Sequence, residues 1–140
     1  MTPPPASGRV LKFRAWDGKK MCFPSVYEFG INGINGLPSI AFQLPDGGYC
    51  TSANIMQFTG LLDRHGTEIY EGNILKLDGG AKPEKIIVEW EQPAARWSCR
   101  VPWLSEKENN LVPLEAYVDM KFCQVEILGN IYEHPELLHA

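Results

Sequence analysis

Hydrophobic and polar residues alternate with a period of two in several stretches of the chain. The first stretch runs from Leu11 to Trp16, with basic residues and Trp16 on one face and apolar residues on the other. Such alternation predicts a half-buried strand. Asp17-Gly18 predicts a turn, after which Met21–Tyr27 is expected to return as a second strand.

The clearest predicted hairpin joins residues 84–91 to residues 96–103 through a short loop. Both stretches alternate, and folding them about the loop gives one apolar face and one mostly polar face. The predicted cross-strand pairs are Trp90 with Trp97, Val88 with Cys99, Ile86 with Val101, Glu91 with Arg96, and Ile87 with Arg100. Trp90, Trp97 and Trp103 share the apolar face, so we expect them in the core or in a subunit interface.

Turn-forming residues separate the remaining predicted strands. Asp63–Gly66 and Glu71–Asn73 have the composition of tight turns between strands. Gly129-Asn130 predicts a bend or a bulge within a strand spanning Phe122–Tyr132. Each of these turns lies beside an apolar stretch, which favours a small sheet protein with short connections.

These patterns predict an all-β, mainly antiparallel protein with minimal helix. Thirteen glycines and 11 prolines in 140 residues interrupt the chain too often for long helices. Residues 1–9, with three consecutive prolines, are expected to form a flexible lead-in, and residues 10–140 a single domain. A subdivision near residues 50–60, into an N-terminal β region and a C-terminal barrel, is an alternative. In the tail, we expect Leu137 and Leu138 to be buried against the core.

Charge and cysteine content narrow the setting. The chain has 13 Lys and Arg against 17 Asp and Glu, and its net charge of −4 counts against generic nucleic-acid binding. Cys22, Cys50, Cys99 and Cys123 lack the close spacing of zinc ligands, so we expect small apolar residues in a reducing compartment. No stretch is long and apolar enough to span a membrane, and residues 1–8 do not resemble a signal peptide. We therefore expect a cytoplasmic protein that does not contact membranes.

Residue types used in catalysis are present, but not in catalytic patterns. His65 falls in a predicted turn, and His134 and His139 fall in the tail, so exposed loop histidines are the simplest interpretation. The carboxylates that could form an acid/base pair are Glu68, Glu71, Glu133 and Glu136. We expect them instead to be solvated or to cap backbone groups. No phosphate-binding loop or dinucleotide fingerprint is present, and we predict no catalytic residue, no metal site and no cofactor.

Three motifs carry a family resemblance. They are the segments Lys12–Asp17, Met56–Ile74 and Ile127–Leu138, and together they resemble, in the same order, the YopX family of bacteriophage and prophage proteins. The resemblance implies an all-β protein with a small Src-homology-type barrel, encoded by a phage or prophage and without an established enzymatic activity. The family usually has Glu-Gly-Asp where this chain has Glu71-Gly72-Asn73. Asn keeps the turn-forming hydrogen bonds of Asp without its charge, so a metal ligand is not expected there.

The face of Lys12, Arg14 and Trp16 is the most suggestive binding surface. Basic residues beside an aromatic ring can follow a nucleic-acid backbone or grip a phosphorylated ligand. The simpler alternative is an outward strand face with Trp16 packed on a neighbouring loop. The candidate ligand-binding residues are Arg14, Trp16, Gln57, Tyr70, Glu71, Asn73 and Tyr132.

Our leading hypothesis is a phage-encoded, non-enzymatic binding module that acts through protein or small-ligand contact as a homo-oligomer. Four Trp and six Phe in a short chain favour self-association. Contact with a host protein is one form of this hypothesis. Capture of a small nucleotide-type ligand, to blunt a host defence pathway, is an alternative. Nucleic-acid binding by the barrel is the weaker alternative because of the negative net charge.

Overall fold

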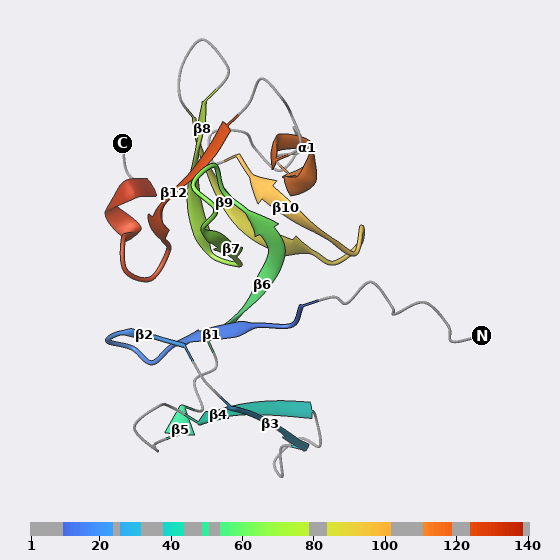
Figure 1. Cartoon of the computed structure of the whole chain (residues 1–140), viewed down its shortest axis with the longest axis vertical. Helices are drawn as coiled ribbons and strands as arrows, with labels where there is room; N and C mark the ends of the chain where they lie inside the picture. Colours follow the sequence, from blue (N-terminus) through green and yellow to red (C-terminus); the bar gives the residue numbers. More distant parts are fainter. Residues whose placement is uncertain are drawn as a thin grey trace, which may run out of the picture.

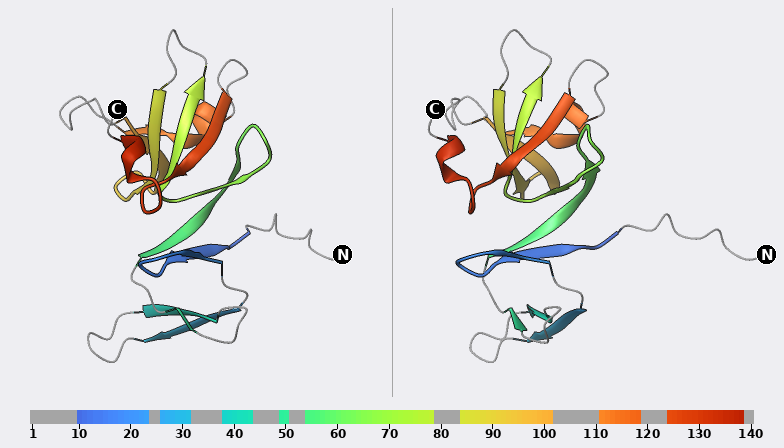
Figure 2. Two further views of the ribbon diagram at one scale, coloured as in Figure 1. Left: turned by 90° about the vertical axis from the view of Figure 1, so that its left-hand side faces the viewer. Right: turned by 60° about the vertical axis from the view of Figure 1, so that its left-hand side comes forward.

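The computed structural model describes residues 10–23, 26–31, 38–43, 49–50, 54–78, 84–101, 111–118 and 124–138. Within these residues the chain forms three antiparallel sheets and little helix (Figure 1). The sheets follow one another along the long axis of the molecule, and one long strand joins the upper two (Figures 1 and 2). The predicted all-β, mainly antiparallel fold is therefore confirmed.

The first hairpin consists of β1 (Phe13–Trp16) and β2 (Met21–Cys22). Asp17 fixes the turn between them, because its Oδ1 accepts the backbone N–H groups of Lys19 and Lys20 at 2.7 and 2.8 Å. These hydrogen bonds hold the pKa of Asp17 below its ordinary value. The turn expected at Asp17-Gly18 is confirmed.

A separate three-stranded sheet contains β3 (Val26–Ile31), β4 (Pro38–Gln43) and β5 (Tyr49–Cys50). The expectation of one strand over Met21–Tyr27 is wrong, because β2 pairs with β1 whereas β3 pairs with β4. Alternation reports which face of a strand is apolar, but it does not report the partner strand. A change of sheet within one apolar stretch therefore escapes detection from sequence.

The long strand β6 (Asn54–Leu62) connects the N-terminal part to the rest of the molecule. Its first half pairs with β1, and its second half pairs with β7 (Glu68–Tyr70) after a shift of register. Gly60 lies within this shift and has a φ of 87°. The strand therefore changes partner from β1 to β7 within one four-stranded sheet, whose order is β2-β1-β6-β7, and it runs from the N-terminal hairpin to the half-barrel (Figure 1).

The largest sheet has five strands and curls into a half-barrel (Figure 2). In spatial order these strands are β11 (Leu111–Pro113), β10 (Arg96–Arg100), β9 (Glu84–Glu91), β8 (Asn73–Asp78) and β12 (Gln124–Asn130). Neighbouring strands are antiparallel throughout. A register shift between Ile127 and Gly129 places a bulge in β12, as the sequence predicts.

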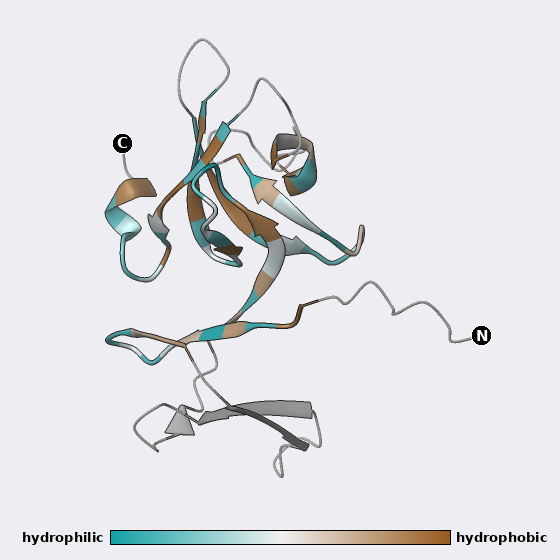
Figure 3. Ribbon diagram, in the orientation of Figure 1, coloured by the Kyte–Doolittle hydropathy of each residue, from teal (hydrophilic) through white to brown (hydrophobic). Residues whose placement is uncertain are grey.

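The hydrophobic core lies inside the curled sheet, where apolar residues concentrate on the strands (Figure 3). Its buried members are Ile69, Leu75, Leu77, Ile86, Val88, Cys99, Val101, Leu114 and Val125. Leu114 belongs to the short helix α1 (Leu114–Val118), which covers one side of the core. Burial of this many branched side chains is the main stabilising contribution to the half-barrel.

The predicted hairpin register is confirmed in β9 and β10. Trp90 faces Trp97, Val88 faces Cys99, Glu91 faces Arg96 and Ile87 faces Arg100, while Val101 follows the last residue of β10. The two indole rings pack edge to face, with their centroids 5.1 Å apart. Trp97 packs against the core, but Trp90 is 38% exposed, so the expectation of a core position is wrong for Trp90 within a single chain.

The described chain ends in a 3-10 helix, Pro135–Leu138. The expectation that Leu137 and Leu138 are buried is wrong, since both are half-buried. A single turn presents too little surface for full burial. A hydrogen bond from Lys85 Nζ to the Leu137 carbonyl, at 3.0 Å, holds the turn to β9 instead.

Other sequence expectations have partial answers. Cys22 and Cys99 are buried, as expected for small apolar residues. Residues 1–9, Trp103, Cys123 and His139, on which further expectations depend, lie outside the described residues. Among the described residues there is no helix with the length and apolar character that a membrane crossing needs.

Candidate functional site

Arg14 on β1 lies at the junction between the N-terminal hairpin and the half-barrel. It is only 6% exposed, and its guanidinium lies 4.8 Å from the centre of the Tyr70 ring. Arg14 Nη2 donates a hydrogen bond to the Glu71 carbonyl at 3.3 Å, whereas its buried Nε has no partner within the described part of the chain. Burial lowers the pKa of Arg14 to about 10, so the side chain remains charged at neutral pH.

The expected basic strip of Lys12, Arg14 and Trp16 is therefore not an open surface. Lys12 is exposed and pairs with Glu68 at 2.7 Å, but Arg14 is turned into the molecule. Alternation along β1 predicts that Arg14 faces solvent. This prediction is wrong because the Tyr70 ring covers the Arg14 side of the strand. A strip with a buried central cation cannot follow a nucleic-acid backbone.

Trp16 and Tyr132 connect the same junction to the C-terminal end of the chain. Their rings are stacked, with the ring centroids 5.9 Å apart and an interplanar angle of 17°. Trp16 thus packs on a neighbouring turn, which was the simpler of the two interpretations of this residue. A stack of this kind contributes roughly 0.5–1.5 kcal/mol beyond the burial of its area.

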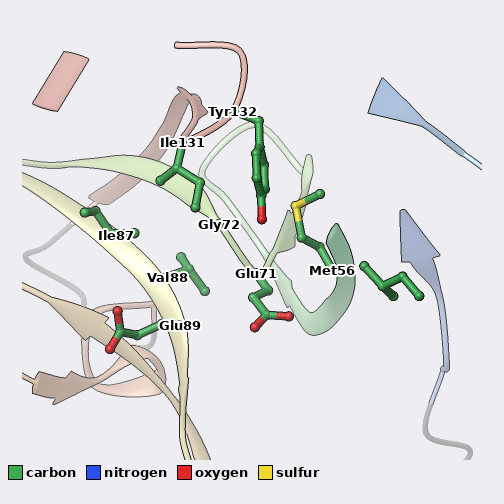
Figure 4. Close-up of a pocket in the computed structure, with 9 residues that line it drawn as sticks. Met56, Glu71, Gly72, Ile87, Val88, Glu89, Ile131 and Tyr132 are labelled. Carbon is green, nitrogen blue, oxygen red and sulfur yellow. The ribbon is translucent and has the colours of Figure 1, made fainter. Parts of the chain in front are cut away.

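A pocket of about 140 Å³ opens beside Tyr132 (Figure 4). Its walls come from β6, from the turn between β7 and β8, from β9 and from the segment after β12. The lining residues are Ile55, Met56, Glu71, Gly72, Ile87, Val88, Glu89, Ile131 and Tyr132. We call this site the junction pocket. Of the candidate residues chosen from the sequence, Glu71 and Tyr132 line it directly.

Two backbone hydrogen bonds position the turn that carries Glu71. The Gly72 N–H donates to the Val88 carbonyl at 2.9 Å, and the Gly72 carbonyl accepts from the Ile131 N–H at 3.0 Å. Gly72 has a φ of 85°, and a Cβ there would lie 3.3 Å from Met56 Sδ. Glycine is therefore required for both the backbone conformation and the width of the pocket.

Two carboxylates, Glu71 and Glu89, line the junction pocket (Figure 4). Burial raises the pKa of Glu71 above its ordinary value, a hydrogen bond with the Gln57 backbone opposes the rise, and the charge of Glu89 adds to it. Glu89 is held by Arg100, whose Nη2 and Nε donate to its two oxygens at 2.6 and 2.9 Å. The salt bridges between described residues do not include Glu71.

The chain was compared with models of known protein families. A family model described as YopX protein matches residues 12–139. The chain belongs to the YopX family. A search of curated proteins found no match.

Two solved structures are similar to this member of the YopX family. Protein EF1440 from Enterococcus faecalis is 27% identical with a TM-score of 0.57, and the match covers 94% of this chain and 99% of that protein. Protein yopX from Bacillus subtilis is 18% identical with a TM-score of 0.57, covering 90% of this chain and 96% of that one. The second likeness shows the fold alone.

Asn73, which the sequence analysis singled out, has a structural role in the turn before β8. Its Oδ1 accepts the Tyr70 N–H at 2.7 Å, and its Nδ2 donates to the Gly129 carbonyl at 3.1 Å. An aspartate has no N–H to offer that carbonyl. The amide thus joins the turn before β8 to the bulge in β12, and Asn73 does not line the pocket.

The remaining candidates lie near the pocket or away from it. Gln57 contributes its backbone carbonyl, which accepts the Glu71 N–H at 2.9 Å. His65 is exposed, and its Nε2 lies 3.2 Å from Oε1 of Glu126. The expectation that His134 is exposed is wrong. Its Nδ1 accepts the Asn130 N–H at 3.3 Å, and a Cβ on Gly129 would overlap its ring.

The described residues hold no group of three or more metal-ligating side chains. Burial raises the pKa of the Cys99 thiol to about 12, so this cysteine is not a thiolate at neutral pH.

Sequence reasoning missed Glu89 and Met56 as members of the site. Glu89 alternates with core residues on β9, which predicts a solvated position. Its cross-strand partner is Ser98, and the diagonal neighbour Arg100, opposite Ile87, lies on the same polar face of the hairpin, which was the available signal. The contribution of Met56 depends on where β6 changes partner from β1 to β7, and no local pattern reports such a change.

Proposed function

We propose that this protein is a phage-encoded, non-enzymatic binding module of the bacterial cytoplasm, and that its contact site is the junction pocket. The observation that supports the proposal is the Glu71 carboxyl, which is half-buried in the pocket wall and forms no salt bridge with another residue that the structure describes. Folded proteins rarely keep such a group without a purpose, because a partly buried charge lowers stability. The phage setting rests on membership of the YopX family.

Protein contact is favoured over a nucleotide-type ligand. Small-molecule sites usually enclose roughly 300–1,000 Å³, whereas a cavity of about 150 Å³ holds a group the size of one benzene ring. The junction pocket, at about 140 Å³, matches a single side chain. Phosphate groups also require cationic donors, and the charged residues that line this pocket are Glu71 and Glu89.

Self-association is the second part of the proposal. Trp90 is 38% exposed, Leu62 48% and Phe23 57%, and exposed apolar side chains of this size favour contact with another protein surface. We expect light scattering to report a homo-oligomer at micromolar concentration, and Trp90→Ser to weaken it. A monomeric wild-type chain under these conditions would remove this part of the proposal.

Site-specific photocrosslinking in a bacterial host tests the contact site. A photoreactive phenylalanine derivative replaces Tyr132 at the pocket and, as a matched control, replaces Gln92 in the exposed turn after β9. We expect protein crosslinks that appear only from position 132 and that excess unlabelled wild-type chain abolishes. Identical crosslinks from both positions, or none from position 132, would contradict the proposal.

A further inference from the structure

The walls of the junction pocket combine apolar and acidic groups. Met56, Ile87 and Ile131 provide the apolar surface, and Glu71 and Glu89 provide the charge (Figure 4). An apolar passage that ends at a carboxylate matches a side chain with an aliphatic stem and a cationic head. The pocket volume, about 140 Å³, is suited to one such side chain.

Two described cations near the pocket, Arg100 and Arg14, already have other partners. Arg100 forms a two-pronged contact with Glu89 at 2.6 and 2.9 Å. Arg14 faces the Tyr70 ring and the Glu71 backbone carbonyl, and it does not line the pocket. A cation from outside the chain can therefore pair with Glu71 without displacing an internal salt bridge.

We propose that the junction pocket binds the cationic side chain of a partner protein, a lysine or an arginine whose stem contacts Met56 and Ile131 and whose charge pairs with Glu71. This proposal rests on the proposed function, because it specifies the chemistry of the partner at the same pocket. Pairing of a partly buried carboxylate with a cation recovers the free energy lost in removing that carboxylate from water.

Such binding depends on pH through Glu71. Among the residues that the structure describes, the charged groups around it are Glu89 on β9, Arg100 on β10 through its contact with Glu89, and Arg14 on β1. Tyr132 is the phenol that lines the pocket, and Tyr70 lies behind it against Arg14. The raised pKa of Glu71 means that affinity for a cation falls as pH is lowered through that pKa, because the carboxyl becomes neutral.

Methyl NMR of Met56 tests the proposal directly. Met56 lines the pocket, whereas Met21 on β2 does not and provides an internal control. The probes are butylammonium, butylguanidinium, the neutral alcohol pentanol, and two blocked tripeptides, acetyl-Gly-Lys-Gly-amide and its norleucine counterpart. We expect saturable shifts of the Met56 methyl with both cations and with the lysine peptide, and none with pentanol or the norleucine peptide.

Two variants define the role of the carboxylate. Glu71→Gln is expected to weaken butylammonium binding about tenfold or more. Glu84→Gln removes one exposed charge from β9 outside the pocket and should leave binding unchanged. The Met21 methyl and the melting temperature confirm that both variants are folded.

Each remaining outcome overturns a stated part of the proposal. Equal binding of pentanol and butylammonium, or equal affinities of wild type and Glu71→Gln, would contradict recognition of a cation. Binding of the free amine without binding of the lysine peptide would contradict a protein side chain as the source. The crosslinking at position 132 is independent of these results, so a contact site of different chemistry would be recognised as such.

Discussion

Asp63 lies in the turn between β6 and β7, and Glu71 in the next turn, between β7 and β8. The surroundings of these two carboxylates shift their pKa values in opposite directions. Burial works against the charge of Asp63, but backbone hydrogen bonds from Thr67, Ile127 and His65 hold its pKa below the ordinary value. The hydrogen bond of Glu71 with the Gln57 backbone does not offset burial, and the pKa of Glu71 is raised. The first turn stabilises its charge, whereas the second does not.

This difference separates a structural acid from a candidate functional one. Asp63 closes its own turn and also reaches β12 through the Ile127 N–H at 3.2 Å, so its charge stabilises the fold. Glu71 belongs to a turn that is equally well fixed through Gly72, but its carboxyl lines the junction pocket. Sites that lower stability in an otherwise consistent structure are typical of function.

Removal of the structural acid should have the largest effect. Asp63→Ala loses hydrogen bonds to three backbone N–H groups, and we expect the free energy of unfolding at pH 7 to fall by about 2–4 kcal/mol. Denaturant titration measures the loss. Asp78→Ala, which removes only exposed ion pairs with Lys76 and Arg64, should change stability by less than about 1 kcal/mol.

The effect of Asp63 should also depend on pH. Its pKa in the folded state is depressed, so its contribution is present above the ordinary value of 3.8 and is lost as pH falls through the folded value. The difference between wild type and Asp63→Ala should therefore shrink in acid. A difference that is constant down to strongly acidic pH would show that the charge of Asp63 is not responsible.

Asn73→Asp adds a carboxylate next to the junction and should have an intermediate effect. The substitution removes the N–H that bonds the Gly129 carbonyl and places a negative oxygen against it. We expect a loss of about 1–3 kcal/mol at pH 7, which decreases at low pH as the new carboxyl is protonated and donates again. An unchanged unfolding midpoint would show that the turn before β8 rearranges easily.

Glu71→Gln should have the smallest effect and the opposite sign. The raised pKa means that the charged form is disfavoured in the folded state, so wild-type stability declines as pH rises from the ordinary value of 4.5 through the raised value. The neutral variant should gain less than about 1 kcal/mol at pH 7 and nothing below pH 4.5. Thermal unfolding at the two pH values, with Glu84→Gln as control, checks this; a loss of stability at pH 7 would make Glu71 a structural residue.

Local chemistry in the sequence predicted the turns and the best hairpin. The side chain of Asp63 and the register of Trp90 with Trp97 depend on neighbours that are close in the chain, and both are as expected. The exposure of Trp90 was not predicted, because alternation assigns a face but does not show whether other elements cover it.

The junction pocket could be predicted only in part. Family motifs directed attention to Glu71 and Tyr132, which line it, and to Arg14, which supports its wall. Glu89 and Met56 join them because β9 hydrogen-bonds the Gly72 turn and because β6 pairs with β1 at one end and with β7 at the other. Such long-range pairing is not encoded in any short stretch of residues.

The most direct test is a carboxyl NMR titration of the wild-type chain, which follows Glu71 and Asp63 in the same sample with and without butylammonium. Our account predicts a Glu71 pKa above 4.5 that falls when the cation is added, and an Asp63 pKa below 3.8 that the cation does not change. A Glu71 pKa at or below 4.5, or one that does not respond to the cation, would contradict it.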